Sequence, residues 1–472
     1  MHDTHTMANM LLGLLGLAAA AASPAAGCEL SITSFGAKAG VNGSSAAFTN
    51  SDAINRTLAA AVAQGPGCVV VVPAGRFVAY GGMSCSGLQD TVVRIDGELV
   101  AEFSVKDWPG CSPAAGQKQK CASFLSFSAA KNLTITSSNH WPLPFPAVPA
   151  EPLDLSSRLH PLRHAGVIDG QGDLWWAWKL ATGKKAPSPL IQISDSQDVL
   201  LEQLQLLSAP SFHVMSKGSR DVEVRYLDIF VDRKVQRRIR AEAAQRLAGS
   251  RDAPAGAAGA AAAAGGGGLL SPFPPQNPAW LNTDGIDPAG SGYHIHNCAI
   301  VNDDDSVAVK PTNSGPNPLS VTCSENMLIE DMVMTGVGAS LGSVTPHVSH
   351  NCVRNITFKN VTMPGTTKGI YIKSNPGCLA DGSKTAEITD VTYEDFRILK
   401  PEWWSVWIGP QQQHEPKSAL GDKCALDYPI TDKCPTQGCV TFSDIVLRDV
   451  AIHDPVLGSP GVILGNSSNP MR

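Results

Sequence analysis

The chain has 472 residues, of which 43% are hydrophobic and 17% are charged. That apolar fraction is enough for a continuous core and excludes disorder of the whole chain. The formal net charge of -6 argues against nucleic acid as the main partner, because phosphate binding relies on a concentrated basic surface.

The N-terminal segment has the pattern of a cleaved secretion signal. Residues 11–22 are an unbroken run of small and apolar residues, and small residues follow up to Gly27, as a signal peptidase requires. We therefore expect residues 1–27 to be removed and the protein to be secreted to the extracellular space or the cell wall. The run is too short to span a bilayer, so we expect no membrane partner.

Twelve cysteines suit the same oxidising compartment, and none has paired zinc-ligand spacing, so disulfides are expected. Proximity in sequence makes plausible the pairs Cys111 with Cys121 and Cys352 with Cys378, and one pair within Cys424, Cys434 and Cys439. Asn-x-Ser/Thr triplets, which can carry glycan, begin at Asn42, Asn55, Asn132, Asn355, Asn360 and Asn466.

The first elements of the expected mature chain are strands and one helix. Residues 28–37 predict a strand that enters a glycine turn, and residues 68–73 and 91–100 predict two more strands. Between them, residues 49–63 are rich in alanine and start with Ser51-Asp52, which predicts a short helix. We expect this helix to cap the open end of the strand array.

An eight-residue pattern then recurs along the chain: apolar, any, apolar, any, polar, apolar, any, apolar. Copies begin at Val199, Val222, Tyr293, Met327, Ile356, Val391 and Ile445. Alternation that changes phase once, usually at Asn or Asp, predicts two short strands joined by a tight bend. One such unit cannot bury its apolar face alone, so the copies must stack. Stacking predicts an all-β fold, a single-stranded right-handed parallel β-helix over residues 28–472.

A β-sandwich of hairpins is the alternative, but its strands would follow one another through short turns at closer spacing. One segment, at about 232–278, interrupts the pattern. It begins with a basic, helix-like run and passes into an Ala/Gly tract with few bulky apolar residues, which predicts a disordered insertion. A functional lid is the other interpretation of this insertion.

Acidic residues cluster immediately after the insertion. Asp284 and Asp287 precede a strand-like run at residues 293–301, and Asp303, Asp304 and Asp305 follow it. Because the groups are about one repeat apart, stacking would place them side by side. Two facing carboxyls can protonate a leaving oxygen and activate water in glycosidic cleavage, and their mutual repulsion raises one pKa. A cation site or a solvated acidic turn is the alternative.

Five motifs in chain order resemble glycoside hydrolase family 28, the polygalacturonases and related pectin hydrolases. Residues 166–176 are similar to its G-x-I-D-G-x-G-x-x-W-W turn, residues 208–213 to S-P-x-W-H, residues 282–285 to N-T-D, residues 303–305 to [GQ]-D-D, and residues 369–373 to G-x-R-I-K. The resemblance implies a pectin-lyase-like β-helix with a cleft along one face. It also implies hydrolysis of α-linked galacturonic acid or a related pectic polysaccharide, with inversion.

The same resemblance implies roles for single residues. Asp304 would be the general acid, and Asp284 with Asp305 would position and deprotonate the attacking water. Asn282 would bind substrate, and Lys373 would pair with a substrate carboxylate as a point charge. We expect no metal or other cofactor, and we expect the chain to act as a monomer.

Two positions depart from the family pattern. The family's G-H-G is Gly336-Val337-Gly338, and valine cannot exchange a proton; the Arg of R-I-K is Tyr371, so bidentate recognition of a carboxylate is lost. His350 or His347 could reach the same space, and Tyr371 could offer its hydroxyl to a sugar. The competing interpretation is a binding protein that does not cut. Retention of all three acids favours the enzyme, because unused clustered carboxylates repel one another.

Other candidates carry open alternatives. His213 either lines the cleft or is a satisfied structural imidazole, whereas His294 and His296 are interpreted as surface positions. The indoles of residues 403, 404 and 407 could stack on sugars, but packing is favoured, and the Trp pair at 175–176 is interpreted as structural. A calcium-dependent pectate lyase is a further possibility, although no Arg lies among the acid motifs to serve as its base.

Overall fold

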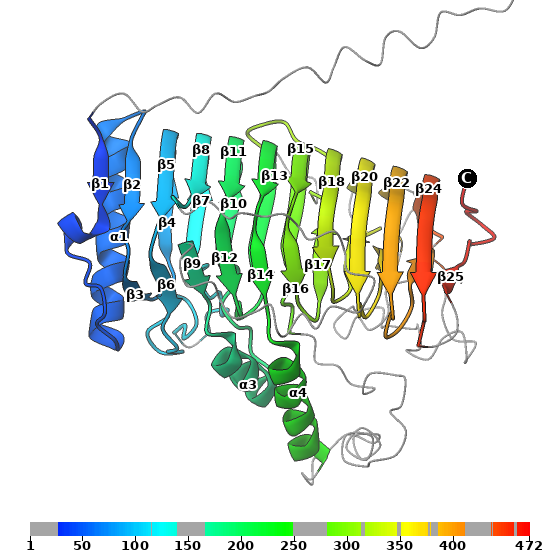
Figure 1. Ribbon diagram of the computed structural model, residues 1–472, viewed down its shortest axis with the longest axis horizontal. Coiled ribbons are helices and arrows are strands. Elements are labelled where there is room, and N and C mark those ends of the chain that lie inside the picture. The colour runs from blue at the N-terminus through cyan, green and yellow to red at the C-terminus, as the bar shows by residue number, and fades with distance from the viewer. Residues whose placement is uncertain are drawn as a thin grey trace, which may run out of the picture.

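The computed structural model describes residues 27–114, 116–138, 166–248, 281–312, 317–346, 351–375, 378, 386–410, 436, 438–456 and 460–472. Over these residues the chain forms a right-handed parallel β-helix, as the sequence predicts. The coils stack side by side along one axis, with the first coil at the left and the last at the right of Figure 1.

Each complete coil contributes strands to three faces, and every strand pairs in parallel with its counterparts on the neighbouring coils. The first face contains β1 Glu29–Ser31, β2 Val69–Val72, β5 Gln89–Ile95, β8 Lys131–Thr136, β11 Gln197–Glu202, β13 Val214–Arg225, β15 Ile286–His296, β18 Ser324–Met334, β20 Asn351–Pro364, β22 Ala386–Leu399 and β24 Val440–His453.

The second face contains β3 Arg76–Ala79, β6 Glu98–Ala101, β9 Gly166–Asp169, β12 Leu204–Leu207, β14 Asp228–Phe230 and β16 Ala299–Val301, and it continues through the ends of β18, β20, β22 and β24. The third face contains β4 Met83–Ser86, β7 Leu125–Ser128, β10 Ile191–Ser194, the starts of β13 and β15, β17 Asp305–Val309, β19 Gly338–Val344, β21 Ile370–Ser374, β23 Val406–Ile408 and β25 Gly461–Ile463.

The recurring pattern lies in register from coil to coil. The first residues of its seven copies are direct partners along the first face, from Val199 opposite Val222 to Val391 opposite Ile445. The fifth residue of every copy has a left-handed backbone with φ between 50° and 58°. Asn and Asp tolerate this conformation better than other residues, and Asn360 donates to Asp331, the bend residue of the preceding coil, at 2.6 Å. The predicted bend is therefore confirmed.

Helix α1 Ser44–Gln64 covers the N-terminal end of the β-helix (Figure 1). The predicted capping helix is therefore confirmed, although it begins at Ser44. Ile54 and Leu58 of this helix belong to the apolar cluster that fills the interior of the coils. Asn50 of the same helix donates to the carbonyl of Val78 at 2.8 Å. Of the strand expected at residues 28–37, only β1 forms, because a 3-10 turn at Ile32–Phe35 follows it.

The start of the insertion is ordered, so the expectation of disorder is wrong for its first part. Residues Arg233–Ala248 form helix α4, which lies beside α3 Gly172–Thr182 on the outside of the coils (Figure 1). Ile239 and Leu180 of these helices pack on a cluster that includes the buried Trp176. The remainder of the expected insertion, residues 249–278, lies outside the described residues, as do residues 1–26 of the expected signal.

Four disulfides join described cysteines: Cys28–Cys68, Cys111–Cys121, Cys323–Cys352 and Cys378–Cys439. Only the expected pair Cys111–Cys121 is confirmed. The pair Cys352–Cys378 is wrong, because Cys352 bonds to its neighbour one coil earlier. A pair involving Cys439 within the C-terminal group is also wrong, and Cys424 and Cys434 lie outside the described residues. Among the helices of the described residues, none is both long and apolar enough to span a bilayer.

Candidate active site

The clustered acids lie at the corner where each coil passes from the second face to the third. Asp284 directly precedes β15, and Asp305 is the first residue of β17 on the next coil. The Gly285 amide donates to the Asp305 carbonyl at 2.9 Å, and Ile286 is the partner of Val307. This pairing brings one carboxylate oxygen from each of Asp284, Asp304 and Asp305 to within 4.8 Å of one another.

A buried amide holds the two acidic segments together. Asn302 is 0% exposed, and its Nδ2 donates to the carbonyls of Thr283 at 2.9 Å and Asp305 at 2.8 Å. Its Oδ1 accepts from the Ser306 hydroxyl at 2.9 Å. Because the amide is bonded to both coils, it fixes the backbone from which the carboxylates project. The structural role of Asn302 could not be predicted from sequence, where it is notable only for its position before the acidic triplet.

Two lysines neutralise the acids. Lys310 Nζ lies 3.3 Å from Asp284 Oδ2, 3.6 Å from Asp287 Oδ2 and 3.4 Å from Asp305 Oδ2. Lys373 Nζ forms an ion pair with the same Asp305 oxygen. Burial would lower the pKa of Lys310, but the surrounding carboxylates outweigh it and hold that pKa well above its ordinary value. Lys310 was not among the site residues expected from sequence.

Asp304 has the environment of a carboxylic acid that keeps its proton. Burial, and then the negative charges of Asp284 and Asp305, raise the pKa of Asp304 to about 8. It is the most exposed of these acids, being of intermediate exposure while Asp284, Asp287 and Asp305 are each 2% exposed. The Asn282 amide donates to Asp304 Oδ2 at 3.1 Å. Asn282 therefore touches the general-acid candidate through its backbone.

Asp305 has the opposite environment. Burial would raise its pKa, but Lys373 and Lys310 outweigh burial and lower the pKa of Asp305 to about 2. The Ser340 hydroxyl also donates to its Oδ1 at 2.8 Å. Burial raises the pKa of Asp284 to about 6 and that of Asp287 well above its usual range. At neutral pH, two carboxylates, Asp284 and Asp305, thus face the two ammonium groups.

The same arrangement bears on metal binding. The oxygens of Asp284, Asp304 and Asp305 are close enough together to share a cation, and oxygen donors suit calcium. However, the ammonium groups of Lys310 and Lys373 already lie against two of these carboxylates. A divalent ion at this corner would meet repulsion from both of them.

Asp303, the first residue of the acidic triplet, faces away from this cluster toward helix α4. It is 5% exposed and accepts from Arg237 Nη2 at 2.6 Å, Arg233 Nε at 3.2 Å and Arg240 Nη1 at 3.2 Å. Burial would raise the pKa of Asp303, but the guanidinium groups outweigh it and lower that pKa. Arg233 and Arg237 also reach Glu402 at 3.2 and 2.8 Å. These three arginines lie on one face of the helix, and their spacing in the basic run was the sequence signal for a shared acidic partner.

His213 has the burial and contacts of the structural alternative rather than those of a residue that lines the cleft. It is 0% exposed, its Nε2 accepts from the Ala209 amide at 3.3 Å, and its Nδ1 lies 2.8 Å from the Asp284 carbonyl. Since both ring nitrogens bond to backbone, neither is left for a sugar. Burial lowers the pKa of His213 to about 4, so the neutral ring holds the backbone of Asp284 in place.

The two departures from the family pattern lie together in one aromatic cluster. Val337 and Tyr371 are each 4% exposed and pack with Trp403, Trp404 and Trp407. The three indoles are therefore buried in packing, which was the favoured interpretation. The Val337 amide donates to the Asp304 carbonyl at 2.8 Å. The ring of Tyr371 lies 3.9 Å from Lys368 Nζ and 5.3 Å from Lys373 Nζ. His347 and His350, expected to reach this space, lie outside the described residues.

Comparisons with known proteins show the family of the chain. The family model for glycosyl hydrolases family 28 matches residues 157–423. A polygalacturonase of Chamaecyparis obtusa is 26% identical over 250 residues, which are 51% of this chain and 37% of that protein. Endo-xylogalacturonan hydrolase A of Aspergillus tubingensis is 24% identical over 318 residues, 67% of this chain and 62% of that protein. The chain thus spans less than two thirds of either relative's length.

The fold has a close counterpart among solved structures. The crystal structure of endo-xylogalacturonan hydrolase from Aspergillus tubingensis aligns with a TM-score of 0.56 at 18% sequence identity. The alignment covers 94% of this chain and 96% of that chain. The architecture is therefore shared along almost the whole chain.

The contacts of Asp303 predict a large and specific loss of stability. Asp303→Ala would leave three guanidinium groups without their buried carboxylate, and we expect it to lower the free energy of unfolding by about 3 kcal/mol. Glu402→Ala removes a carboxylate that is 38% exposed, so it should cost at most about 1 kcal/mol. Urea unfolding of both variants measures the difference. Equal losses would contradict the anchoring of α4 through Asp303.

Proposed function

The chain belongs to the glycosyl hydrolases of family 28, and from this membership we propose that it hydrolyses α-linked galacturonic acid in a pectic polysaccharide. One observation supports the proposal above the others: neighbouring carboxyls have pKa values displaced in opposite directions, to about 8 at Asp304 and about 2 at Asp305. Such a pair provides a proton donor and a carboxylate at the same pH.

We assign the general acid to Asp304. Its pKa of about 8 keeps it protonated at neutral pH, and it is the most exposed acid of the catalytic cluster, so a glycosidic oxygen can reach it. The Asn282 and Asp305 amides donate to its two oxygens at 3.1 and 3.0 Å. These bonds orient the carboxyl and stabilise the carboxylate that forms when the proton is transferred.

The attacking water is assigned to Asp284 and Asp305. A water that makes two hydrogen bonds of about 2.8 Å can bridge oxygens roughly 5 Å apart, and these carboxylate oxygens lie within 4.8 Å. Asp284 Oδ1 is buried and accepts no hydrogen bond from any described residue, so a water enclosed at this corner would supply its missing partner. Asp305 is held by Lys373 and Ser340, which suits a positioning role.

Recognition of a negatively charged chain rests on cations near this corner. Tyr371 cannot give the bidentate contact of an arginine, and Lys373, expected to pair with a substrate carboxylate, is paired with Asp305. Arg233, Arg237 and Arg240 of α4 pair with Asp303, and the first two also pair with Glu402, so these guanidinium groups place positive charge beside the site. We propose that this charge attracts the uronate groups of the substrate.

The substrate is drawn from the pectic class that the names of the relatives share. We propose a secreted protein, since the disulfides of the described residues suit an oxidising compartment, and we propose that it acts as a monomer. The pair of lysines against the acids favours hydrolysis over a calcium-dependent lyase reaction, and the division of the acids into donor and acceptor favours catalysis over binding alone.

Replacement of the general acid tests the proposal directly. We expect Asp304→Asn to lower kcat on polygalacturonan or xylogalacturonan by about 10²–10⁴-fold with little change in KM, because general acids contribute that much to turnover. Reducing-sugar release from a panel of pectic polymers, with and without chelator, is the measurement. Asp449→Asn, on an exposed bend, serves as the control.

Undiminished activity of Asp304→Asn would overturn the assignment of the acid. An unsaturated, ultraviolet-absorbing product that disappears with chelator would show lyase chemistry instead. If the native protein binds these polymers but releases no sugar from any of them, it is a binding protein.

The displaced pKa values predict the pH dependence of turnover. Asp304 must be protonated, so kcat/KM should fall as pH rises through its pKa of about 8. Asp284 must be ionised, so kcat/KM should fall as pH drops through its pKa of about 6, while Asp305 stays ionised in this range. A pH–rate profile therefore should peak between these values. A maximum near pH 4 would contradict Asp284 as a required base.

We propose inversion at the anomeric carbon, because Asp284 and Asp305 together hold water rather than one of them attacking the sugar. Carboxyl separations of about 6.5–9.5 Å are usual for inverting enzymes and about 5–5.5 Å for retaining ones. The oxygen spacing within 4.8 Å is nearer the retaining range, so the stereochemistry needs its own test. Proton NMR of early products should show the β-anomer first; initial α-anomer would establish retention.

A further inference from the structure

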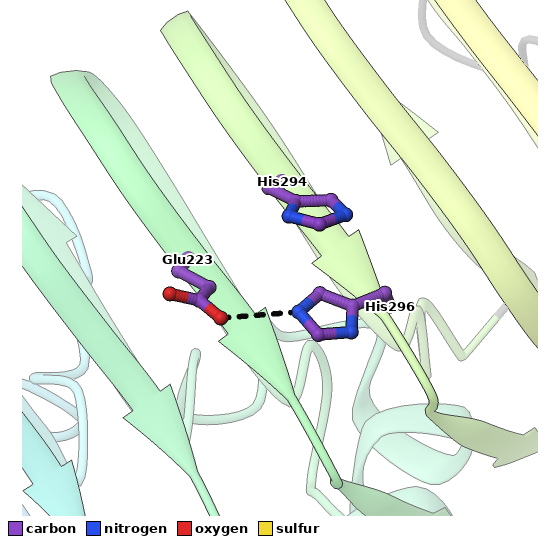
Figure 2. A group of neighbouring side chains, drawn as sticks. All are labelled: Glu223, His294 and His296. Carbon is purple, nitrogen blue, oxygen red and sulfur yellow. Dashed lines mark hydrogen bonds and ion pairs between the residues drawn. The ribbon is translucent and has the colours of Figure 1, made fainter. Parts of the chain in front are cut away.

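A second cluster of ligating side chains lies on the outer surface of the first face, apart from the acidic corner. His294 and His296 project from β15, with Glu223 on the neighbouring β13 (Figure 2) and Glu330 on the other neighbour, β18. Residues two apart on a strand point to the same side of the sheet, and the two imidazole rings are stacked with centroids 4.1 Å apart. The cluster therefore spans three consecutive coils.

The register places one carboxylate on each side of the histidine pair. Glu223 is the direct partner of His294, and Glu330 is the direct partner of His296. The contacts run diagonally: His296 Nε2 lies 3.1 Å from Glu223 Oε1, and His294 Nε2 lies 2.9 Å from Glu330 Oε1. One ligand atom from each of Glu223, His294 and His296 lies within 4.8 Å of the others.

The contacts of His296 favour a cation between its ring and the Glu223 carboxylate. Its Nδ1 lies 2.7 Å from Asn297 Oδ1, while its Nε2 faces the Glu223 carboxylate. A neutral imidazole has one N–H, so it cannot donate to both oxygens. With the proton on Nδ1, the Nε2 lone pair and the carboxylate converge on a space between them that suits a cation. A partner on the outer nitrogen is also how proteins orient histidine ligands of metals.

We propose that His294, His296 and Glu223 form a binding site for a divalent transition metal such as zinc, with Glu330 available as a fourth ligand. Imidazole and carboxylate are ligands that zinc accepts, whereas calcium and magnesium prefer oxygen alone. Zinc bonds of about 2.0–2.2 Å require the ligand atoms to move somewhat closer together. The side chains of His294 and Glu223 are 43% and 34% exposed, which leaves them room to turn.

Arg225 is the cation that competes for this site. Its Nη1 lies 2.7 Å from Glu223 Oε1, but its Nε also lies 2.8 Å from Glu202 Oε2. Glu202 therefore retains the arginine when Glu223 turns toward a metal ion. The ion would join β13 to β15 on neighbouring coils and so would stabilise the coil that carries Asp284. A ligand that binds only the folded chain raises its melting temperature, and the rise grows with the logarithm of the free ligand concentration above Kd.

The test uses the full chain after treatment with chelator and dialysis. Titration with zinc chloride, followed by calorimetry and by thermal unfolding, should show saturable binding of one ion and a Tm higher by several degrees. Magnesium and calcium chlorides should produce neither effect. Addition of cobalt(II) should give visible absorption bands of nitrogen-ligated metal, which report the site without any variant.

Variants separate this cluster from other places where zinc could bind. His294→Gln with His296→Gln should abolish the zinc effect, and Glu223→Gln should weaken binding at least about tenfold. His453→Gln removes an exposed histidine elsewhere and should bind zinc normally, as should Asp304→Asn at the acidic corner. Absence of a zinc effect in the native chain, or an equal effect in the double variant with unchanged circular dichroism, would overturn the proposal.

Discussion

Parallel pairing between successive coils is the constraint on which the rest of the structure depends. Each strand is aligned with the same part of the coil before and after it, so residues far apart in sequence become neighbours on one face. Asp284 and Asp305 meet because Gly285 bonds to the Asp305 carbonyl across this register. A slip of one residue would turn every side chain of β15 to the opposite side of the sheet and would separate the acids.

Such a close group of carboxylates persists because its charges are balanced locally. Four acids, Asp284, Asp287, Asp304 and Asp305, share the corner with Lys310 and Lys373. Burial raises the pKa of Asp287 and of Asp304, whereas Lys373 and Lys310 lower that of Asp305. The same balance creates the chemical asymmetry, because the lysines lie against Asp305 and not against Asp304. The opposite shifts in pKa at Asp304 and Asp305 therefore come from burial at the first and from lysine placement at the second.

The sequence predicted what depends on local alternation and on the spacing of the repeat, and it missed what depends on the particular length of each coil. The bent repeat units and the capping helix follow from patterns within short segments, and the pairing of the two acidic groups follows from their separation by about one repeat. The partner of Cys352 does not, because coils differ in length and proximity in sequence favours the wrong cysteine. Lys310 and Asn302 give no pattern of their own, since one lysine or one asparagine at the end of a strand is common. The pairing of Asp303 with α4 was hidden because the basic run looked like part of a disordered insertion.

The chain is held by hydrogen bonds where it re-enters the β-helix after the insertion. At the return point, Lys179 of α3 bonds to the Leu281 carbonyl and to Asn282 Oδ1, each at 2.9 Å. Gln236 of α4 donates to the Thr283 hydroxyl at 3.1 Å.

These contacts fix residues 281–283, directly before Asp284, to two helices that pack on the same coils. The departure end is fixed as well, because the arginines of α4 bond to Asp303 on the next coil. The chain is therefore held by hydrogen bonds on both sides of the insertion, close to the acids. The position of Asp284 therefore depends on these anchors and on the pairing of β15 with its neighbours.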